Sequence, residues 1–231
     1  MSCFKFKQFT ILQEKSAMKV GTDAVLLGSW VTCKDSEMIL DVGCGTGVIT
    51  LMLAQRNKKS IITAIEIDKL ASKEAQLNIN NSDWNNRIHV ENIALQDFTT
   101  SKKFNLIISN PPYFSFNHSY ERRDIARHMN TLTLEDLLSN SVNLLAEQGV
   151  LAIIIPKKSE MDFCKTARNH RLYINRVCYI KGNKKSTIKR VMIELSFLHS
   201  EIIKENLIIE HSRHNYTNKY INLCKDFYLD F

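Results

Sequence analysis

The chain has 231 residues, a formal net charge of +7 and an apolar fraction of 44%. This size and composition favour a single globular domain spanning 1–231, and no apolar run approaches the roughly 20 residues that cross a bilayer. The N-terminus lacks the apolar core of a signal peptide, and the six cysteines are scattered without a C-x-x-C pair. We therefore expect a reduced, cytoplasmic protein without a membrane segment or a cysteine-bound metal.

Strand-like and helix-like apolar patterns alternate along the chain. The strand-like patterns lie near residues 38–42, 61–66, 88–92, 104–109, 150–155, 172–180 and 188–198. The helix-like patterns lie near residues 23–31, 48–54, 69–80, 133–146 and 159–170. This alternation predicts an α/β fold with a mostly parallel sheet covered by helices on both faces, and the last two strands predict an antiparallel hairpin at its C-terminal edge. Ligands bind at the carboxyl ends of such strands.

A glycine-rich loop follows the first strand pattern. Asp41 ends the strand, glycines follow at Gly43, Gly45 and Gly47, and a helical pattern begins at Val48. A strand, a tight glycine turn and a helix open a βαβ unit that binds a nucleotide-containing cofactor. The G-x-G-x-G spacing favours S-adenosylmethionine over a dinucleotide. The acid points the same way, because a carboxylate before the loop would repel a pyrophosphate but suits a cationic aminoacyl group.

Further cofactor contacts are expected after the next two strands. Glu66 lies 19 residues after Gly47, about where the ribose-binding acid of such folds belongs, and its alternative role is a solvated carboxylate at a strand end. Asp68 is a second candidate for the ribose. The third strand leads into a segment that should flank the adenine of the cofactor. Because many related enzymes carry an aspartate where Ala94 stands, either Asp97 or backbone groups near Ala94 would make this contact.

Residues 110–113 read Asn-Pro-Pro-Tyr and follow the apolar run 104–109. An exocyclic amine is a poor nucleophile, and two acceptors against its N–H groups localise the lone pair and stabilise the charge that forms during attack. The Asn110 side chain and the Pro111 carbonyl can supply these acceptors, held rigidly by the prolines, while Tyr113 would stack on a flipped base. The alternative is a plain Pro-Pro turn. The cofactor loop elsewhere in the chain favours methylation of an NH2 group on a base or on glutamine.

The basic residues of the chain are concentrated in the segment 157–190, which holds eleven Lys and Arg and only two acids. Such a surface suits a phosphate backbone, and the candidate contacts are Lys184, Lys185, Lys189 and Arg190. The alternative is a lysine-rich solvated face.

A long loop, 114–130, also carries polar residues that could meet phosphate or base, namely Arg123, Arg127 and His128. Solvation of the loop, with Arg127 paired to an acid, is the alternative. His211 and His214 have loose metal-like spacing, but no cysteine or acid cluster accompanies them, so no metal site is expected.

With these motifs in view, the chain resembles the bacterial tRNA(Val) adenine-N6 methyltransferases, which modify the adenosine at tRNA position 37, beside the anticodon. The matching segments are Phe4–Phe9, Ala17–Trp30, Asp41–Gly47, Ile107–Tyr113, Arg123–His128 and Asn215–Tyr228. The glycine loop and Asn-Pro-Pro-Tyr are shared with many methyltransferases, whereas the segment 17–30 and the tail are more specific.

The resemblance implies a Rossmann-like class I methyltransferase domain that uses S-adenosylmethionine. Residues 1–36 would close over the cofactor and the substrate, with Asp23 the expected contact to the methionine end, and 199–231 would form a family-specific tail. From the residues alone, Thr22 or Asp23 is an ordinary helix cap.

The predicted function is therefore methyl transfer to N6 of an adenine in the anticodon stem-loop of a tRNA, with no stable protein partner implied. Three rivals stay open. A protein glutamine methyltransferase would use the same Asn-Pro-Pro-Tyr chemistry but has less need of the basic segment. A DNA adenine methyltransferase would need room for a target-recognition domain. A non-catalytic tRNA-binding module would not require Asn110 or the three loop glycines.

Overall fold

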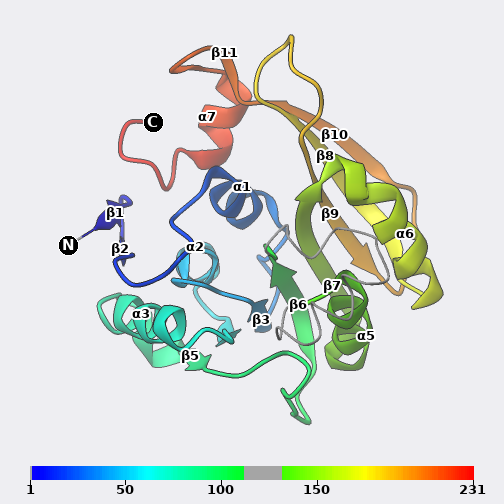
Figure 1. The fold of residues 1–231 in the computed structure, drawn as a ribbon. Coiled ribbons are helices and arrows are strands. Elements are labelled where there is room, and N and C mark those ends of the chain that lie inside the picture. Colours follow the sequence, from blue (N-terminus) through cyan, green and yellow to red (C-terminus); the bar gives the residue numbers. More distant parts are fainter. Residues whose placement is uncertain (1, 112–131) are drawn as a thin grey trace.

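A twisted sheet forms the centre of the computed structural model, which describes residues 2–111 and 132–231 (Figure 1). Within these residues the sheet has eight strands in the order β10-β8-β9-β7-β6-β3-β4-β5. The strands are β3 (Met38–Val42), β4 (Ile61–Ile65), β5 (Ile88–Glu91), β6 (Phe104–Ser109), β7 (Leu145–Pro156), β8 (Tyr173–Lys181), β9 (Arg190–Ser196) and β10 (Ile203–Ile208). Only β9 runs against its neighbours β7 and β8, so the prediction of a mostly parallel sheet is confirmed.

Helices cover both faces of the sheet, as predicted. They are α1 (Thr22–Trp30), α2 (Val48–Arg56), α3 (Lys69–Asn80), α5 (Leu134–Leu144), α6 (Glu160–Asn169) and α7 (Asn218–Cys224), with 3₁₀ turns η1 (Asn85–Arg87) and η3 (Lys157–Ser159). Successive strand residues point to opposite faces. In β3, Ile39 therefore packs into the core under α1, α2 and α7, while Leu40 packs into the core under α5 and α6. None of the helices described has the length and apolar character that crossing a membrane requires.

The C-terminal part of the sheet holds two differences from the expected boundaries. The predicted hairpin is present as β8 and β9, but β10 adds a parallel strand outside β8 that the sequence pattern does not predict. Its mixed sequence, Ile-Lys-Glu-Asn-Leu-Ile, leaves only Leu207 fully buried, so no clear period is visible. Strand β7 also begins five residues before the predicted start at 150, and the register with β6 shifts there.

Segments from both ends of the chain pack together beside α1 (Figure 1). The hairpin of β1 (Cys3–Lys5) and β2 (Thr10–Leu12) meets the tail through the Lys7 N–H, which donates to the Phe227 carbonyl at 2.9 Å. A second hairpin, β11 (Glu210–Ser212) and β12 (Asn215–Tyr216), precedes α7. The described part of the tail is therefore a structural partner of the N-terminal segment.

Candidate active site

Three strand ends bring the predicted functional residues to one level of the sheet. In the register, Val42 of β3 pairs with both Ile65 of β4 and Ser109 of β6. The residues that follow, Gly43, Glu66 and Asn110, therefore leave the carboxyl edge side by side. The Ser109 hydroxyl donates to the Val42 carbonyl at 2.9 Å, which ties the strand that carries Asn110 to the strand that carries the glycine loop. Asn110 is half-buried and Pro111 is buried.

The glycine loop adopts a backbone that other residues rarely take. Gly43, Gly45 and Gly47 have φ angles of +69°, +57° and +83°. A Cβ at Gly47 would lie 3.5 Å from the Cβ of Ala75, an ordinary contact, so the positive φ rather than a lack of space favours glycine there. At Gly43 and Gly45 a built Cβ meets no atom of the described residues within 4 Å, which leaves space beside the loop in the part of the chain that the structure describes.

Glu66 holds the loop from the next strand. Its Oε2 accepts from the Gly45 N–H at 2.9 Å and its Oε1 from the Asp68 N–H at 2.8 Å. The Asn92 side chain, which the sequence patterns do not single out, donates to the carbonyls of Glu66 and Ile67 at 2.8 and 2.9 Å. Glu66 is 9% exposed, and carboxylate oxygens each accept more than one hydrogen bond, so acceptor capacity remains for a ligand.

Asp41 lies beneath the loop and is only 1% exposed. Its Oδ2 accepts from the Thr50 hydroxyl at 2.5 Å, whereas its Oδ1 is buried without a hydrogen-bond partner among the described residues. Burial raises the pKa of Asp41 from 3.8 to about 7; the Thr50 hydrogen bonds lower it and the charge of Glu66 raises it. A buried acceptor without a partner is costly, and a cationic group placed against it would remove that cost.

These features fit S-adenosylmethionine. The unpaired Asp41 oxygen suits a cationic aminoacyl end, and the space beside Gly43 and Gly45 would be filled by side chains at those positions. Glu66 stands at the strand end where a ribose acid is expected. Ala94 and Asp97 share one turn, in which the Asp97 N–H donates to the Ala94 carbonyl at 3.1 Å; Ala94 is half-buried and Asp97 is exposed.

The N-terminal segment is fastened to the cofactor side by residues that sequence reasoning missed. The Glu74 carboxylate, 4% exposed on α3, accepts three backbone N–H groups, those of Glu14, Lys15 and Ser16, at 2.6 to 2.7 Å. Asn78, one turn along, bridges to the Leu12 backbone and to the carbonyl of Thr46 in the glycine loop. The signal in the sequence is an acid followed four residues later by an amide within the predicted helix 69–80. Both side chains bind backbone groups far away in the sequence, so the sequence alone does not show what they bind.

Two predicted site residues bind one another. Arg190, expected on the RNA surface, donates from its Nε to Asp23 Oδ2 at 2.8 Å, although 167 residues separate them. Asp23 lies in the first turn of α1, and Arg190 begins β9 opposite Pro156, the last residue of β7. Both side chains are partly exposed at the carboxyl edge of the sheet, so this pair joins the N-terminal segment to the basic segment.

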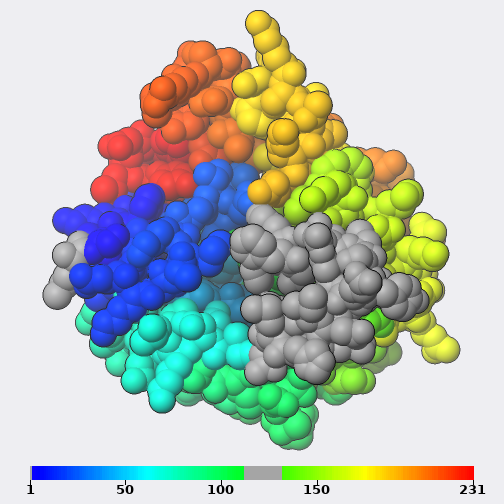
Figure 2. All heavy atoms as spheres, in the orientation of Figure 1, coloured from blue at the N-terminus to red at the C-terminus, as the bar shows by residue number. Residues whose placement is uncertain are grey.

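The basic segment divides into cations that are engaged and cations that are exposed. Arg176 bridges to Glu194 and Glu205 and lies over the Trp30 ring, and Lys157 pairs with Glu160. Lys184, Lys185 and Lys189 are exposed on the loop between β8 and β9. Figure 2 shows this loop, in gold, projecting from the molecule beside the orange hairpin of β11 and β12. Backbone hydrogen bonds from Ile209 to Lys181 and from Glu210 to Gly182 hold the two together.

Four predicted residues lie outside the part of the chain that the structure describes: Tyr113, Arg123, Arg127 and His128. Within the described part, no group of three or more histidine, cysteine or acidic side chains is arranged to hold a metal. All six cysteines are free thiols, and burial raises the pKa of Cys44 in the loop well above its ordinary value.

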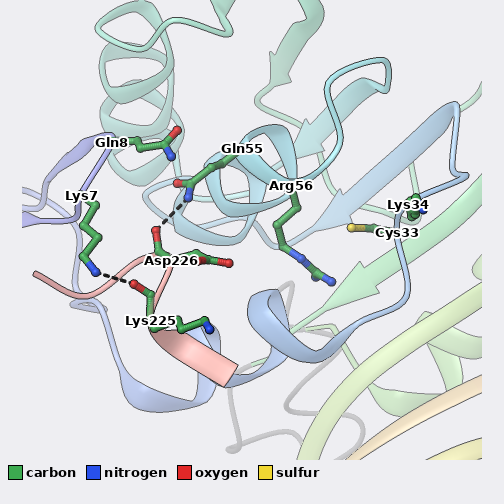
Figure 3. A pocket seen from close by; sticks show the side chains of 8 residues that line it. All are labelled: Lys7, Gln8, Cys33, Lys34, Gln55, Arg56, Lys225 and Asp226. Atoms are coloured by element: carbon green, nitrogen blue, oxygen red, sulfur yellow. Dashed lines mark hydrogen bonds between the residues drawn. The ribbon is translucent and has the colours of Figure 1, made fainter. Parts of the chain in front are cut away.

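A cavity of about 600 Å³ lies away from this edge, where α2 ends (Figure 3). Its lining residues are Lys7, Gln8, Cys33, Lys34, Gln55, Arg56, Lys225 and Asp226. Arg56 donates to the Gly28 carbonyl at 2.8 Å, and Lys7 donates to the carbonyls of Lys225 and Phe231 at 2.6 and 2.7 Å. These cations stabilise backbone carbonyls and the C-terminal ends of helices, which explains why they line the cavity. We therefore assign the cavity a structural role and no part in the catalytic edge.

Comparisons with known proteins agree with this geometry. Residues 15–170 match the model of the methyltransferase small domain. A protein of Christiangramia forsetii named tRNA1(Val) (adenine(37)-N6)-methyltransferase is 42% identical over 233 residues, which cover 98% of this chain and 97% of that protein. A protein of Trichodesmium erythraeum with the same name is 43% identical, covering 99% of this chain and 98% of that protein.

Among solved structures, a protein of Agrobacterium tumefaciens described as a predicted O-methyltransferase superposes with a TM-score of 0.70 at 18% identity, covering 89% of this chain and 96% of that one. This likeness shows that the fold is shared. The sequence identity above 40% to the two tRNA1(Val) methyltransferases, over nearly the whole length of both chains, shows the family as well as the fold. The chain therefore belongs to the family of tRNA1(Val) (adenine(37)-N6)-methyltransferases.

Proposed function

We propose that the protein transfers a methyl group from S-adenosylmethionine to N6 of the adenosine at position 37 of tRNA(Val). The observation that carries the proposal is the shared level of Asn110 and Gly43 at the carboxyl edge, fixed by the pairing of Ser109 with Val42. That arrangement places an acceptor for an amine next to a loop that fits the cofactor. Family membership supplies the target base.

The chemistry assigned to this chain is to raise the nucleophilicity of the amine. The Asn110 side-chain carbonyl and the Pro111 backbone carbonyl accept the two N–H groups of N6, which localises the lone pair on nitrogen. Each charge-assisted hydrogen bond of this kind is worth roughly 1.5–3 kcal/mol. The cofactor, when bound, supplies an electrophilic methyl group on a sulfonium. The proton leaves N6 after transfer, so no general base is required, and Tyr113 would stack on the flipped adenine.

Cofactor binding is assigned to the loop and its two acids. Asp41 would take the aminoacyl ammonium on its unpaired Oδ1, Glu66 would take the ribose hydroxyls, and the turn of Ala94 and Asp97 would flank the adenine. The three loop glycines allow the backbone to approach. Asp23 would act on the cofactor side together with Arg190, its ion-pair partner, rather than as an isolated carboxylate.

The RNA partner we propose is the anticodon stem-loop. Lys184, Lys185 and Lys189 are exposed on a loop at the catalytic edge, where they would meet the phosphates of the stem. A single-stranded loop makes removal of the target base from its stack inexpensive. Arg123, Arg127 and His128 remain predicted contacts from the segment 112–131.

The test is methyl transfer from labelled S-adenosylmethionine to unmodified total tRNA, with DNA and release factor in parallel and the product mapped by digestion and mass spectrometry. We expect N6-methyladenosine beside the anticodon of tRNA(Val). Asn110→Ala should lower transfer by about two to three orders of magnitude while cofactor binding persists. Asn86→Ala, at an exposed residue before β5, is the matched control. Label in release factor or DNA, or full activity of Asn110→Ala, would contradict the proposal.

A further inference from the structure

A second cavity, of about 460 Å³, lies between the N-terminal strand, the start of α1 and the tail. Five of its eleven lining residues are aromatic, namely Phe4, Tyr216, Tyr220, Tyr228 and Phe231. The opening is a depression in the protein surface, and contiguous apolar patches on a surface mark interaction sites. An aromatic-lined opening therefore needs an explanation beyond core packing.

The aromatic rings of the lining pack edge to face on one another. Phe231 meets Tyr216, Tyr220 and Tyr228 at interplanar angles of 65°, 77° and 72°, with ring centroids 5.1 to 5.5 Å apart. In these edge-to-face contacts the rings do not stack on one another. Phe6 stacks on Tyr228, whereas Tyr216 and Phe231 are partly exposed, so a planar ligand could reach the solvent side of these two rings.

The position of the cavity relates it to the catalytic edge. Thr22 lines the cavity, and the next residue, Asp23, pairs with Arg190 at the carboxyl edge of the sheet. On the other side, Tyr216 ends the hairpin that is hydrogen-bonded to residues 181 and 182, where the basic loop begins. The cavity is thus flanked on both sides by elements that reach the proposed RNA surface.

Polar groups around the rings match the edge of a base rather than a hydrocarbon. Lys5 and Asp230 line the cavity and offer a donor and an acceptor. The hydroxyls of Tyr220 and Tyr228 hydrogen-bond to each other, and burial raises the pKa of both groups, that of Tyr228 to about 12. Asp230 disfavours a phosphate inside the cavity, whereas an uncharged base meets no such penalty.

We propose that this cavity binds one nucleobase of the substrate RNA, a base near the target adenosine in the anticodon loop, by stacking on the partly exposed rings of Tyr216 and Phe231. The inference rests on the proposed function and deepens it by assigning a second base site, distinct from Asn110. Stacking on aromatic side chains tolerates any base, and the polar rim adds the selectivity.

The test combines RNAs that lack one base with variants of the protein that lack one ring. An anticodon stem-loop RNA is made with an abasic site at each loop position in turn, and its affinity is measured by fluorescence anisotropy for the wild type, Tyr216→Leu and Tyr216→Phe. For the wild type and for Tyr216→Phe, we expect an abasic site at one loop position other than the target to weaken binding of the RNA roughly tenfold relative to the intact RNA. Tyr216→Leu should bind the intact RNA about tenfold more weakly and lose nothing further at that position.

The matched control is Tyr173→Leu, which removes a ring at the start of β8, on the opposite edge of the sheet, and should leave affinity unchanged. If Tyr216→Leu does not fold, 2-aminopurine placed at each loop position reports stacking on the wild type through quenching at one position. Equal abasic losses in wild type and Tyr216→Leu at every position, or no quenching, overturn the inference while leaving the proposed function intact. A wild type that methylates no tRNA overturns both.

Discussion

The substitution Asp41→Asn gives the sharpest test of how the cofactor loop works. It keeps the size of a side chain that is 1% exposed and bonded to Thr50, but removes an ionisable group whose pKa burial raises from 3.8 to about 7. The folded protein binds this proton more tightly than the unfolded chain does. The stabilisation from protonated Asp41 is therefore complete below about pH 4 and is lost as the pH rises through 7.

The magnitude follows from linkage. For pKa values of 3.8 and about 7, the contribution of Asp41 to the free energy of unfolding falls by about 2 kcal/mol between pH 5 and pH 7. Urea unfolding at several pH values would measure this loss in the wild type. Asp41→Asn should lack it, and comparison of the two proteins cancels the histidines and other acids that titrate in the same range.

The same reasoning covers the cofactor. A cation held by Asp41 needs the ionised carboxylate, so the affinity of the wild type for S-adenosylmethionine should fall about tenfold for each pH unit below 7. Calorimetry should show a much flatter profile for Asp41→Asn, with weaker binding at pH 8. Parallel curves of unfolding free energy for the two proteins would refute the raised pKa, and parallel binding profiles would refute contact with the cation.

Three further changes test neighbouring features. Gly45→Ala should lower the free energy of unfolding by about 1–2 kcal/mol, because φ is +57°, whereas a built Cβ meets no atom of the described residues within 4 Å. Urea unfolding would measure this loss, and calorimetry should show weaker cofactor binding. Glu74→Gln should cost about 2 kcal/mol and speed hydrogen exchange at the amides of residues 14–16, which protection equal to the wild type would contradict. Replacing Lys184, Lys185 and Lys189 by Gln should lower the salt dependence of tRNA binding by roughly two in the log–log slope, and an unchanged slope would place the RNA elsewhere.

The sequence was sufficient for the features that depend on local patterns. The mostly parallel sheet follows from the alternation of apolar patterns, and the tight glycine turn after β3 follows from the G-x-G-x-G spacing. The level shared by Gly43, Glu66 and Asn110 also follows, because each residue comes directly after a strand of one parallel sheet.

The sequence was not sufficient where function depends on long-range pairs. Nothing local joins Asp23 to Arg190, and the two appear separately as a cofactor residue and an RNA residue. The charge count of 157–190 likewise treats Arg176 as a surface cation, although Glu194 and Glu205 neutralise it beside Trp30. Such residues become partners because the packing of helices and strands brings them together.

The contact between the N-terminal hairpin and the tail sets an order in which parts of the protein can fold during translation. Lys7 emerges early, but its N–H is held by the Phe227 carbonyl, and the ring of Phe6 stacks on Tyr228 at a centroid distance of 6.1 Å. Both partners are translated about 220 residues after the residues that they contact. The strands β3 to β7 and the glycine loop can therefore form during synthesis, whereas the hairpin of β1 and β2 completes its contacts only after translation of the tail.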